Sequence, residues 1–191
     1  MKVALLIAAA LPIAFGCGSD HDGGEAVIDG EVEGRRLTAH GAIALPAYPD
    51  PEGIAPGLIF PILISESPDA CAAWRRNQRP RGSFILDLRL HDEGRESLRA
   101  GEYGSLTTRI WTGTVAASSL ARMDASCKIT SSYDGRSSTT VTLDRDARPG
   151  DSVSGRFQIA FGSDTITGTF KAAPCDARPV FEPGVEVTCG P

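Results

Sequence analysis

Short stretches in which apolar and polar residues alternate cover most of the chain after Ala26. Alternation with a period of two places successive side chains on opposite faces of a strand, so that one face is buried. The clearest stretch is residues 153–161, and the pattern resumes in residues 165–171 after the turn residues Gly162-Ser163-Asp164. The two stretches predict a β-hairpin with residues such as Phe157 and Phe170 on its buried face.

Similar patterns predict strands along the rest of the chain. The turn dipeptide Asp134-Gly135 predicts a second hairpin between residues 127–132 and 138–143. In residues 84–90 the even positions are expected to face the core, opposite Ile85, Asp87 and Arg89. The further strands are expected at residues 27–33, 37–45, 58–65, 84–90, 107–115, 121–130 and 185–189.

Helical signals are few. Ser67 can cap a short helix with Pro68 at its first position and Asp69 in its first turn, and this helix is expected to end near Arg76. Residues 92–100 are expected to add another turn or two. About nine short strands separated by turns predict an all-β fold, an antiparallel β-sandwich with a β-barrel as the alternative. The whole of residues 26–191 is expected to form this single domain.

The N-terminal residues have the composition of a secretory signal peptide. Lys2 precedes an apolar run over residues 3–15, and the small residue Gly16 comes next. The run is too short to cross a hydrocarbon layer of about 30 Å as a helix. Residues 1–16 are therefore interpreted as a signal peptide, and the polar, Gly-rich residues 17–25 as a flexible tether.

The segment Ala14-Phe15-Gly16-Cys17 resembles the lipobox of bacterial lipoproteins, in which the cysteine is acylated and becomes the mature N-terminus. The resemblance implies lipidation of Cys17, and two or three acyl chains hold a protein on a membrane stably. Gly18 follows the cysteine, and by the sorting rule of these lipoproteins this implies the outer membrane. The alternative is a periplasmic or secreted protein in which Cys17 is free or disulfide-bonded.

The five cysteines fit the same interpretation, because acylation of Cys17 leaves an even number. The remaining four can form two disulfides in an oxidising compartment, with three possible pairings. We favour Cys71 with Cys175 and Cys127 with Cys189, because these bonds would close long loops and tie the helix and the Pro-rich tail to the sheets. A local bond between Cys175 and Cys189 is the main alternative.

The body of the chain also resembles uncharacterised small lipoproteins of Gram-negative bacteria, in which a Gly-x-Tyr strand and a closing Gly-x-Phe hairpin end in cysteine. The matching segments are Cys71 after a strand, Gly101-Glu-Tyr103, Val153-Ser-Gly-Arg-Phe157 and Gly168-Thr-Phe-Lys-Ala-Ala-Pro-Cys175. The resemblance implies a disulfide-bonded β fold in the cell envelope, and it implies no activity.

The charge balance argues against nucleic acid as a partner. The chain has 19 Lys and Arg against 24 Asp and Glu, a net charge of −5, so it has no basic surplus to neutralise phosphates. Its 3 histidines do not occur at paired ligand spacing, and we expect no metal or cofactor.

Motifs that suggest catalysis also fit turns and loops. Gly150-Asp151-Ser152-Val153 resembles the nucleophile block of a lipase and esterase family, but no histidine follows His91 to activate the serine. Residues 91–96 are interpreted as a solvated loop, and the aspartates at 144, 146 and 151 as turn residues rather than calcium ligands. We therefore do not expect an enzyme, and an undetected hydrolase is the second alternative function.

One basic segment stands out on this acidic chain, with four arginines in residues 74–81: Arg75, Arg76, Arg79 and Arg81. Guanidinium groups suit phosphate and carboxylate ligands, so the segment is a candidate site for an anionic glycan or a lipid headgroup. The alternative is a helix end whose cations complement the helix dipole. The sequence as a whole predicts a lipid-anchored cell-envelope protein that acts as a structural or protein-interaction module, with anionic glycan or headgroup binding as the first alternative.

Overall fold

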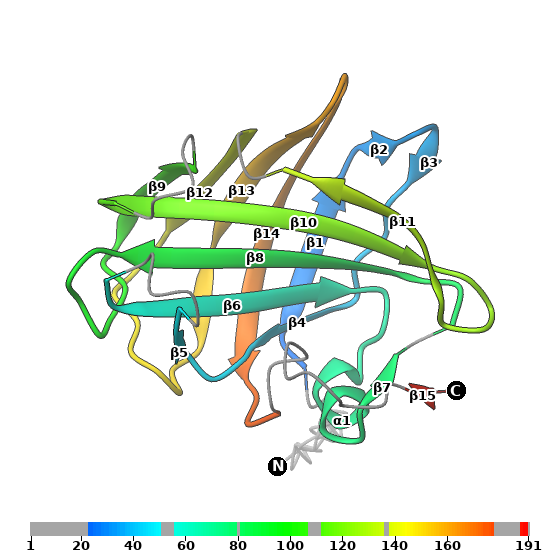
Figure 1. The fold of residues 1–191 in the computed structure, drawn as a ribbon, viewed down its shortest axis with the longest axis horizontal. Coiled ribbons are helices and arrows are strands. Elements are labelled where there is room, and N and C mark those ends of the chain that lie inside the picture. The colour runs from blue at the N-terminus through cyan, green and yellow to red at the C-terminus, as the bar shows by residue number, and fades with distance from the viewer. Residues whose placement is uncertain are drawn as a thin grey trace, which may run out of the picture.

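A computed structural model of the protein describes residues 23–50, 56–79, 81–106, 112–135, 138–177 and 188–190. The expected signal peptide and Cys17 lie outside the described residues. The described residues form one helix, α1 (Ala70–Arg75), and many strands (Figure 1). The strands are β1 (Glu25–Asp29), β2 (Glu31–Val32), β3 (Arg35–Arg36), β4 (Gly41–Ala44), β5 (Tyr48–Pro49), β6 (Leu58–Ser65), β7 (Gln78–Arg79), β8 (Phe84–Asp92), β9 (Gly101–Ser105), β10 (Thr114–Met123), β11 (Ile129–Asp134), β12 (Thr139–Leu143), β13 (Val153–Phe161), β14 (Asp164–Pro174) and β15 (Thr188–Cys189).

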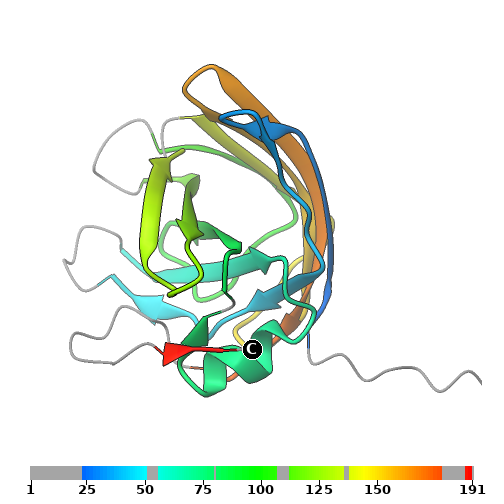
Figure 2. The same ribbon diagram turned by 90° about the vertical axis from the view of Figure 1, so that its right-hand side faces the viewer.

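Eight strands close into a barrel in the order β4-β6-β8-β10-β9-β12-β13-β14. The ring closes because β14 continues beyond its hairpin with β13 and pairs in parallel with β4, with Ala173 opposite Ile43. Figure 2 shows the strands arranged around this ring. The prediction of an all-β fold is confirmed, whereas a sandwich is not, and the closed ring is the alternative that the strand pattern left open.

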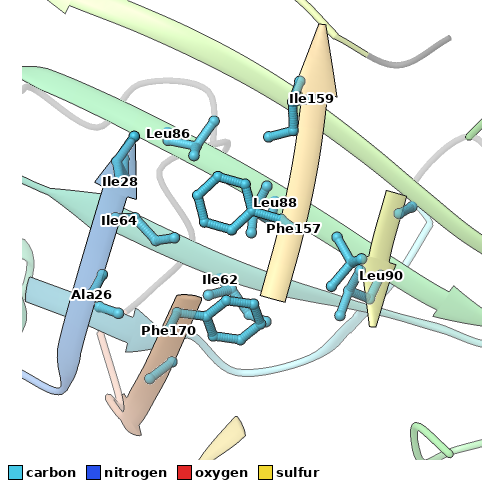
Figure 3. Close-up of a cluster of buried hydrophobic side chains, with 14 of the residues drawn as sticks. Ala26, Ile28, Ile62, Ile64, Leu86, Leu88, Leu90, Phe157, Ile159 and Phe170 are labelled. Atoms are coloured by element: carbon cyan, nitrogen blue, oxygen red, sulfur yellow. The ribbon is translucent and has the colours of Figure 1, made fainter. Parts of the chain in front are cut away.

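The barrel interior is filled with apolar side chains. Phe157 and Phe170 stack with their ring centroids 6.4 Å apart and lie among aliphatic side chains from β6 and β8 (Figure 3). On β13 the predicted alternation is confirmed, because Phe157 and Ile159 are buried while Arg156 and Gln158 are exposed. Burial of the apolar side chains in the barrel interior is the main contribution to the stability of the fold.

A second apolar cluster covers the outside of one wall of the barrel. Leu63 on β6 and Ile85 on β8 point away from the interior, yet both are buried beneath Trp74 of α1 and its neighbours. The expectation that Ile85 and Asp87 lie opposite the core was therefore incomplete, since both faces of β8 are buried. The cluster consists of Ile43, Leu45, Leu63, Ala70, Cys71, Trp74, Ile85, Met123, Cys175 and Ala177.

Two disulfides hold the outer elements, and they confirm the favoured pairing. Cys71 of α1 is bonded to Cys175, directly after β14, across 104 residues. Cys127, in the turn before β11, is bonded to Cys189 of β15, which pairs in parallel with β7. Both bonds close long loops, as expected, and the local alternative between Cys175 and Cys189 is wrong.

Several local predictions need correction. The helix begins at Ala70 rather than Pro68, with Asp69 instead of Ser67 at the cap position and no side-chain cap hydrogen bond, while the main chain of Ser67 is hydrogen-bonded to the Ser65 hydroxyl. Residues 92–100 form turns and a bridge from Leu98 to Ala147 instead of a helix. The expected strand at 121–130 is interrupted by a turn between β10 and β11. Part of the strands expected at 107–115 and 185–189 lies outside the described residues.

The second predicted hairpin is also wrong. β11 pairs with β10, and β12 pairs with β9 on one side and β13 on the other. Both edges of β12 are therefore occupied, which leaves none for β11. The turn dipeptide indicated a change of direction correctly but not the partner strand.

Candidate functional site

The four predicted arginines lie together around α1 and β7, and two of them have structural roles. Arg75 donates a hydrogen bond to the Asp176 carboxylate, and this bond together with the arginine charge lowers the pKa of Asp176. Arg79 is 4% exposed, and its guanidinium lies 3.5 Å from the centroid of the Trp74 ring. Burial lowers the pKa of Arg79 to about 10. Arg79 is therefore part of the packing beneath α1.

The other two arginines are exposed and donate to neutral acceptors. Arg76 Nε donates to the side-chain oxygen of Gln78 over 2.9 Å, and Arg81 Nε donates to the Gly190 carbonyl over 3.1 Å. Neither acceptor carries a charge, and no carboxylate of the described residues forms a salt bridge with either guanidinium group. These two residues are the part of the basic segment that can meet an anion.

The N-terminal end of the described chain lies beside the same elements. A Cβ placed on Gly23 would be 2.6 Å from the Pro68 carbonyl oxygen, just before α1, and Gly24 forms a bridge with Ala42 of β4. Gly23, the first described residue, therefore lies next to the start of α1. Figure 1 shows α1, β7 and β15 at the same end of the molecule.

His91 and Asp92 are not in a solvated loop, as the sequence was interpreted, but in the last part of β8. His91 is fully buried, and its Nδ1 lies 3.2 Å from the Leu58 carbonyl oxygen. Asp92 is 2% exposed and accepts two hydrogen bonds from Arg99, at 2.7 and 2.9 Å. Only the residues that follow, 93–96, are exposed. The hydrogen bonds between Asp92 and Arg99 thus fix the end of β8 to the loop that leads to β9.

The turn residues have the local roles that turns require. The Asp146 carboxylate accepts a hydrogen bond from the Ala100 amide, and Asp151 accepts one from the Arg148 amide. Ser152 lies just before β13, and its hydroxyl accepts a hydrogen bond of 2.6 Å from Arg145. β13 is separated from β8, which carries His91, by three strands of the ring. The structure does not bring this serine and histidine together.

A charged pair lies on the covered outer wall of the barrel. Arg89 Nε donates to Asp87 Oδ2 over 2.9 Å, while Asp87 Oδ1 is buried and has no hydrogen-bond partner among the described residues. Burial raises the pKa of Asp87, and the neighbouring Arg89 opposes this rise. The pKa of Tyr48, on β5, is also raised, mainly by burial. The pattern of residues 84–90 indicated Asp87 as a surface residue and gave no sign of this pair.

A groove that the sequence did not indicate lies at one end of the barrel. It has a volume of about 460 Å³ and lies between the β2–β3 turn, β11 and the turn that joins β13 to β14. These elements lie close together in Figure 1, at the end away from β9. The groove is lined by Val32, Glu33, Ser132, Tyr133, Asp134, Phe161, Gly162, Ser163 and Asp164.

Two hydrogen bonds that meet at Glu33 link the three sides of the groove. The Tyr133 hydroxyl donates to the Glu33 carboxylate, and the Glu33 amide donates to Asp164 Oδ2 over 2.8 Å. Glu33 holds a φ of 52°, in the left-handed region that non-glycine residues rarely adopt. The two hydrogen bonds join residues that are 100 and 131 positions apart in the sequence. The groove therefore forms only when these distant segments come together in the fold.

Within the described residues, one group of possible metal ligands lies close enough together to hold an ion, Cys71, Cys175 and Asp176. Its two cysteines form a disulfide, and its aspartate is paired with Arg75, so the group does not have the donors that a metal needs. No helix in the described part of the chain has the length and apolar character needed to cross a membrane. Comparisons with protein-family models, with curated proteins and with solved structures each give no match for this chain.

Proposed function

We propose that the protein is a lipid-anchored component of the cell envelope whose barrel acts as a structural or protein-interaction module. The observation that carries the proposal is the use of the cysteines. Cys71, Cys127, Cys175 and Cys189 are all consumed in two disulfides, so Cys17 is the cysteine left for acylation. Disulfides persist in oxidising compartments, which supports an extracytoplasmic location.

The packing of the barrel supports an interaction role. The interior is occupied by apolar side chains from β6, β8, β13 and β14, so a partner meets the outside of the barrel and the turns at its ends. The two disulfides limit the movement of α1 and β15 on that outside. A rigid surface loses little entropy on association, which suits a module that binds another protein.

The test is the intact mass of the protein isolated, without reduction, from the membranes of its own host. We expect residues 17–191 plus two or three acyl chains and minus four hydrogens, two for each disulfide. The matched control is the Cys17→Ser variant, which should lose the acyl mass and the membrane association and keep both disulfides. An unacylated mass for the unaltered protein would refute the anchor.

A second function, binding of anionic glycans or lipid headgroups, is favoured by Arg76 and Arg81. Both are exposed and have neutral hydrogen-bond partners. An acylated Cys17 would also bring them to a bilayer, because only five residues lie between Cys17 and Gly23, and the six peptide steps span at most about 22 Å. Clustered arginines near such a surface contribute about 1 kcal/mol each to attraction by anionic lipids.

This second function is tested with vesicles. The Arg76→Ser/Arg81→Ser variant should lose binding to vesicles that contain anionic lipid, and binding of the unaltered protein should weaken with added salt. The matched control is Arg35→Ser/Arg36→Ser, which removes the same charge from exposed residues of β3. Equal loss in the two variants would show a general charge effect and would refute a site at Arg76 and Arg81.

A further inference from the structure

The two disulfides differ in how far solvent reaches them. Cys71 and Cys175 are 1% and 4% exposed and belong to the apolar cluster beneath α1. Cys127 and Cys189 are half-buried, and the residues on either side of Cys127 are exposed. A disulfide is opened by a thiolate that attacks one of its sulfurs, so the rate of reduction depends on access to that sulfur. A thiol in solution can therefore reach the Cys127–Cys189 bond while the other bond stays shielded.

The Cys127–Cys189 bond joins β15 to the barrel. Among the described strands β15 pairs with β7 alone, over two residues, and neither of them belongs to the large sheet that forms the barrel. Cys127 lies between β10 and β11, which are both strands of that large sheet. The hydrogen bonds of residues 188–190 within the described chain are to residues 77–81. A two-stranded ladder this short is marginal in water, so β15 depends on the bond.

The turn that carries Cys127 is ordered by contacts of its own. The Asp124 side chain accepts hydrogen bonds from the amides of Ser126 and Lys128, at 2.7 and 3.0 Å. The Asp124 carbonyl accepts a further bond of 3.0 Å from the Cys127 amide. Cys127 Sγ lies 3.3 Å from the Arg79 carbonyl oxygen, which can accept a hydrogen bond from the thiol that reduction would create. Opening the disulfide would thus leave this turn in place and release β15.

β15 also orients the two exposed arginines of the basic segment. The carbonyl of Gly190, directly after β15, accepts the hydrogen bond from Arg81 Nε. Gly190 also lies against Gln78, since a Cβ placed on it would be 3.3 Å from Gln78 Cβ. The Gln78 side chain in turn accepts the hydrogen bond from Arg76 Nε. Both guanidinium groups are therefore held through Nε, and their Nη atoms have no hydrogen-bond partner among the described residues.

We propose that the Cys127–Cys189 bond is a redox site, and that a dithiol reductant which opens it releases β15 and with it the ordered positions of Arg76 and Arg81. The inference rests on the proposed binding of anionic headgroups, whose regulation it names. Side chains that are already ordered lose less entropy when they bind an anion, so the closed form binds more tightly than the open form.

The exchange balances with the dithiol as co-reactant. One thiolate of the dithiol attacks a sulfur of the bond, forms a mixed disulfide and displaces the other cysteine as a thiolate, which takes up a proton. The second thiolate of the dithiol then attacks the mixed disulfide and displaces the remaining cysteine. Two electrons and two protons pass from the dithiol to Cys127 and Cys189, and the dithiol leaves as its disulfide. The reverse exchange closes the bond again.

The first test locates the reducible bond. The folded Cys17→Ser chain, whose four remaining cysteines are all disulfide-bonded, is treated with dithiothreitol, and free thiols are alkylated and located by peptide mass. The Cys127–Cys189 pair should be labelled at least about tenfold faster than the other pair, because a buried bond reacts only after local opening. In urea, the control, this difference should disappear. Equal rates in the folded chain, or faster labelling of Cys71, would overturn the redox site.

The second test follows the guanidinium groups by NMR. The Cys127→Ser/Cys189→Ser variant serves as the permanently open form. The Nε–H signals of Arg76 and Arg81 should show a lower heteronuclear NOE in this variant than in the closed protein, because their acceptors are no longer held. Arg99 is the matched control, since its Nε donates to Asp92 and should be equally ordered in both forms. Unchanged values for Arg76 and Arg81 would overturn the link between the bond and the arginines.

The third test measures binding to vesicles that contain phosphatidylglycerol. The open form should bind several-fold more weakly than the closed protein, although the two carry the same charge. In the Arg76→Ser/Arg81→Ser chain the same opening should have no effect, because the arginines whose order it controls are gone. Equal binding of the open and closed forms would overturn the regulation.

The two proposals fail separately. If the unaltered protein does not bind the anionic vesicles, headgroup binding is refuted, while the labelling rates still decide the redox site. If both disulfides are reduced at the same rate, the redox site is refuted, and the vesicle binding of Arg76→Ser/Arg81→Ser still decides headgroup binding.

Discussion

Two walls of the same barrel are built on different patterns. The β13–β14 hairpin buries one face, and Arg156, Gln158 and Thr169 on the other face are exposed. The β6–β8 wall buries both faces, and around Leu63 and Ile85 its outside is covered by α1 and the segment after β14. The first wall is one layer between the core and solvent. The second lies between the core and an outer layer.

The comparison shows what an outer layer adds and what it requires. Buried on both faces, β6 is apolar at almost every position, as is usual for strands enclosed between layers. The helix in the outer layer, α1, has only 6 residues. The disulfide from Cys71 to Cys175 fixes this helix to the end of β14. A short helix is only marginally stable alone, so the disulfide and the packing of Trp74 hold it in place.

The largest effect is expected for truncation in the shared core. Phe157→Ala should reduce the free energy of unfolding by about 3–5 kcal/mol, because the ring is buried against Phe170. Gln158→Ala, one position along on the exposed face, should change it by no more than about 0.5 kcal/mol. Urea unfolding of the two variants measures the contrast. A large cost at Gln158 would contradict the one-layer description of this wall.

Removal of the bond that fixes the outer layer comes next. Cys71→Ala/Cys175→Ala should cost about 2–4 kcal/mol by the loop-entropy argument. Proteolysis should then cut first near α1, while the β13–β14 hairpin stays protected. The comparison variant is Cys127→Ala/Cys189→Ala, which opens a shorter loop. Its disulfide joins residues 62 positions apart, whereas Cys71 and Cys175 are 104 positions apart. First cleavage within β13 would show that the outer layer is not a separate unit.

A smaller loss is expected on the outer face of β8. Ile85→Ala should cost about 2 kcal/mol, at the lower end of the range for buried aliphatic residues, because Ile85 is 8% exposed and its cover can partly relax. On β13 the corresponding outward position costs almost nothing. Thermal unfolding of Ile85→Ala and Leu86→Ala side by side measures the two faces of one strand. No loss at Ile85 would mean that β8 is covered on one face only.

The smallest net change is expected at Asp87, since two effects oppose each other. Asp87→Asn removes a buried charge but also weakens the bond from Arg89. Because the folded-state pKa of Asp87 is raised above 3.8, its favourable contribution is present below that pH and is lost as the pH rises through the folded value. Between pH 4 and 8 the variant should lose less stability with rising pH than the unaltered protein. Urea unfolding at a series of pH values measures this. If the free energy of unfolding changed equally with pH in the two proteins, the raised pKa would be refuted.

The elements that the sequence predicted well are those built from large apolar residues. β6 and the β13–β14 hairpin match the expected residues closely, β6 because it is a continuous apolar run and the hairpin because its large apolar residues alternate with polar ones. β10 was predicted only at its two ends and missed in its middle, since Ala116 to Ser119 are small residues that give no alternation. The covered face of β8 was also missed, because a pattern within one strand does not show what packs on it.

The arginine segment and the groove also differ in how far the sequence could predict them. The arginine segment is contiguous, so its composition was visible, but the stacking of Arg79 on Trp74 and the pairing of Arg75 with Asp176 depend on the fold. The groove was invisible because Glu33, Tyr133 and Asp164 come from three distant segments. Strand pairing and ring closure bring them together, and neither follows from local pattern alone.

The central structural claim is that the β6–β8 wall lies between two apolar layers, and methyl NMR with a soluble gadolinium reagent tests it directly. The reagent broadens signals that solvent reaches. We expect the methyl groups of Leu63 and Ile85 to be protected as fully as those of Ile159 in the barrel interior, while Val27, 65% exposed on β1, is strongly broadened. Broadening of Leu63 and Ile85 to the level of Val27 would contradict the outer layer and the account built on it.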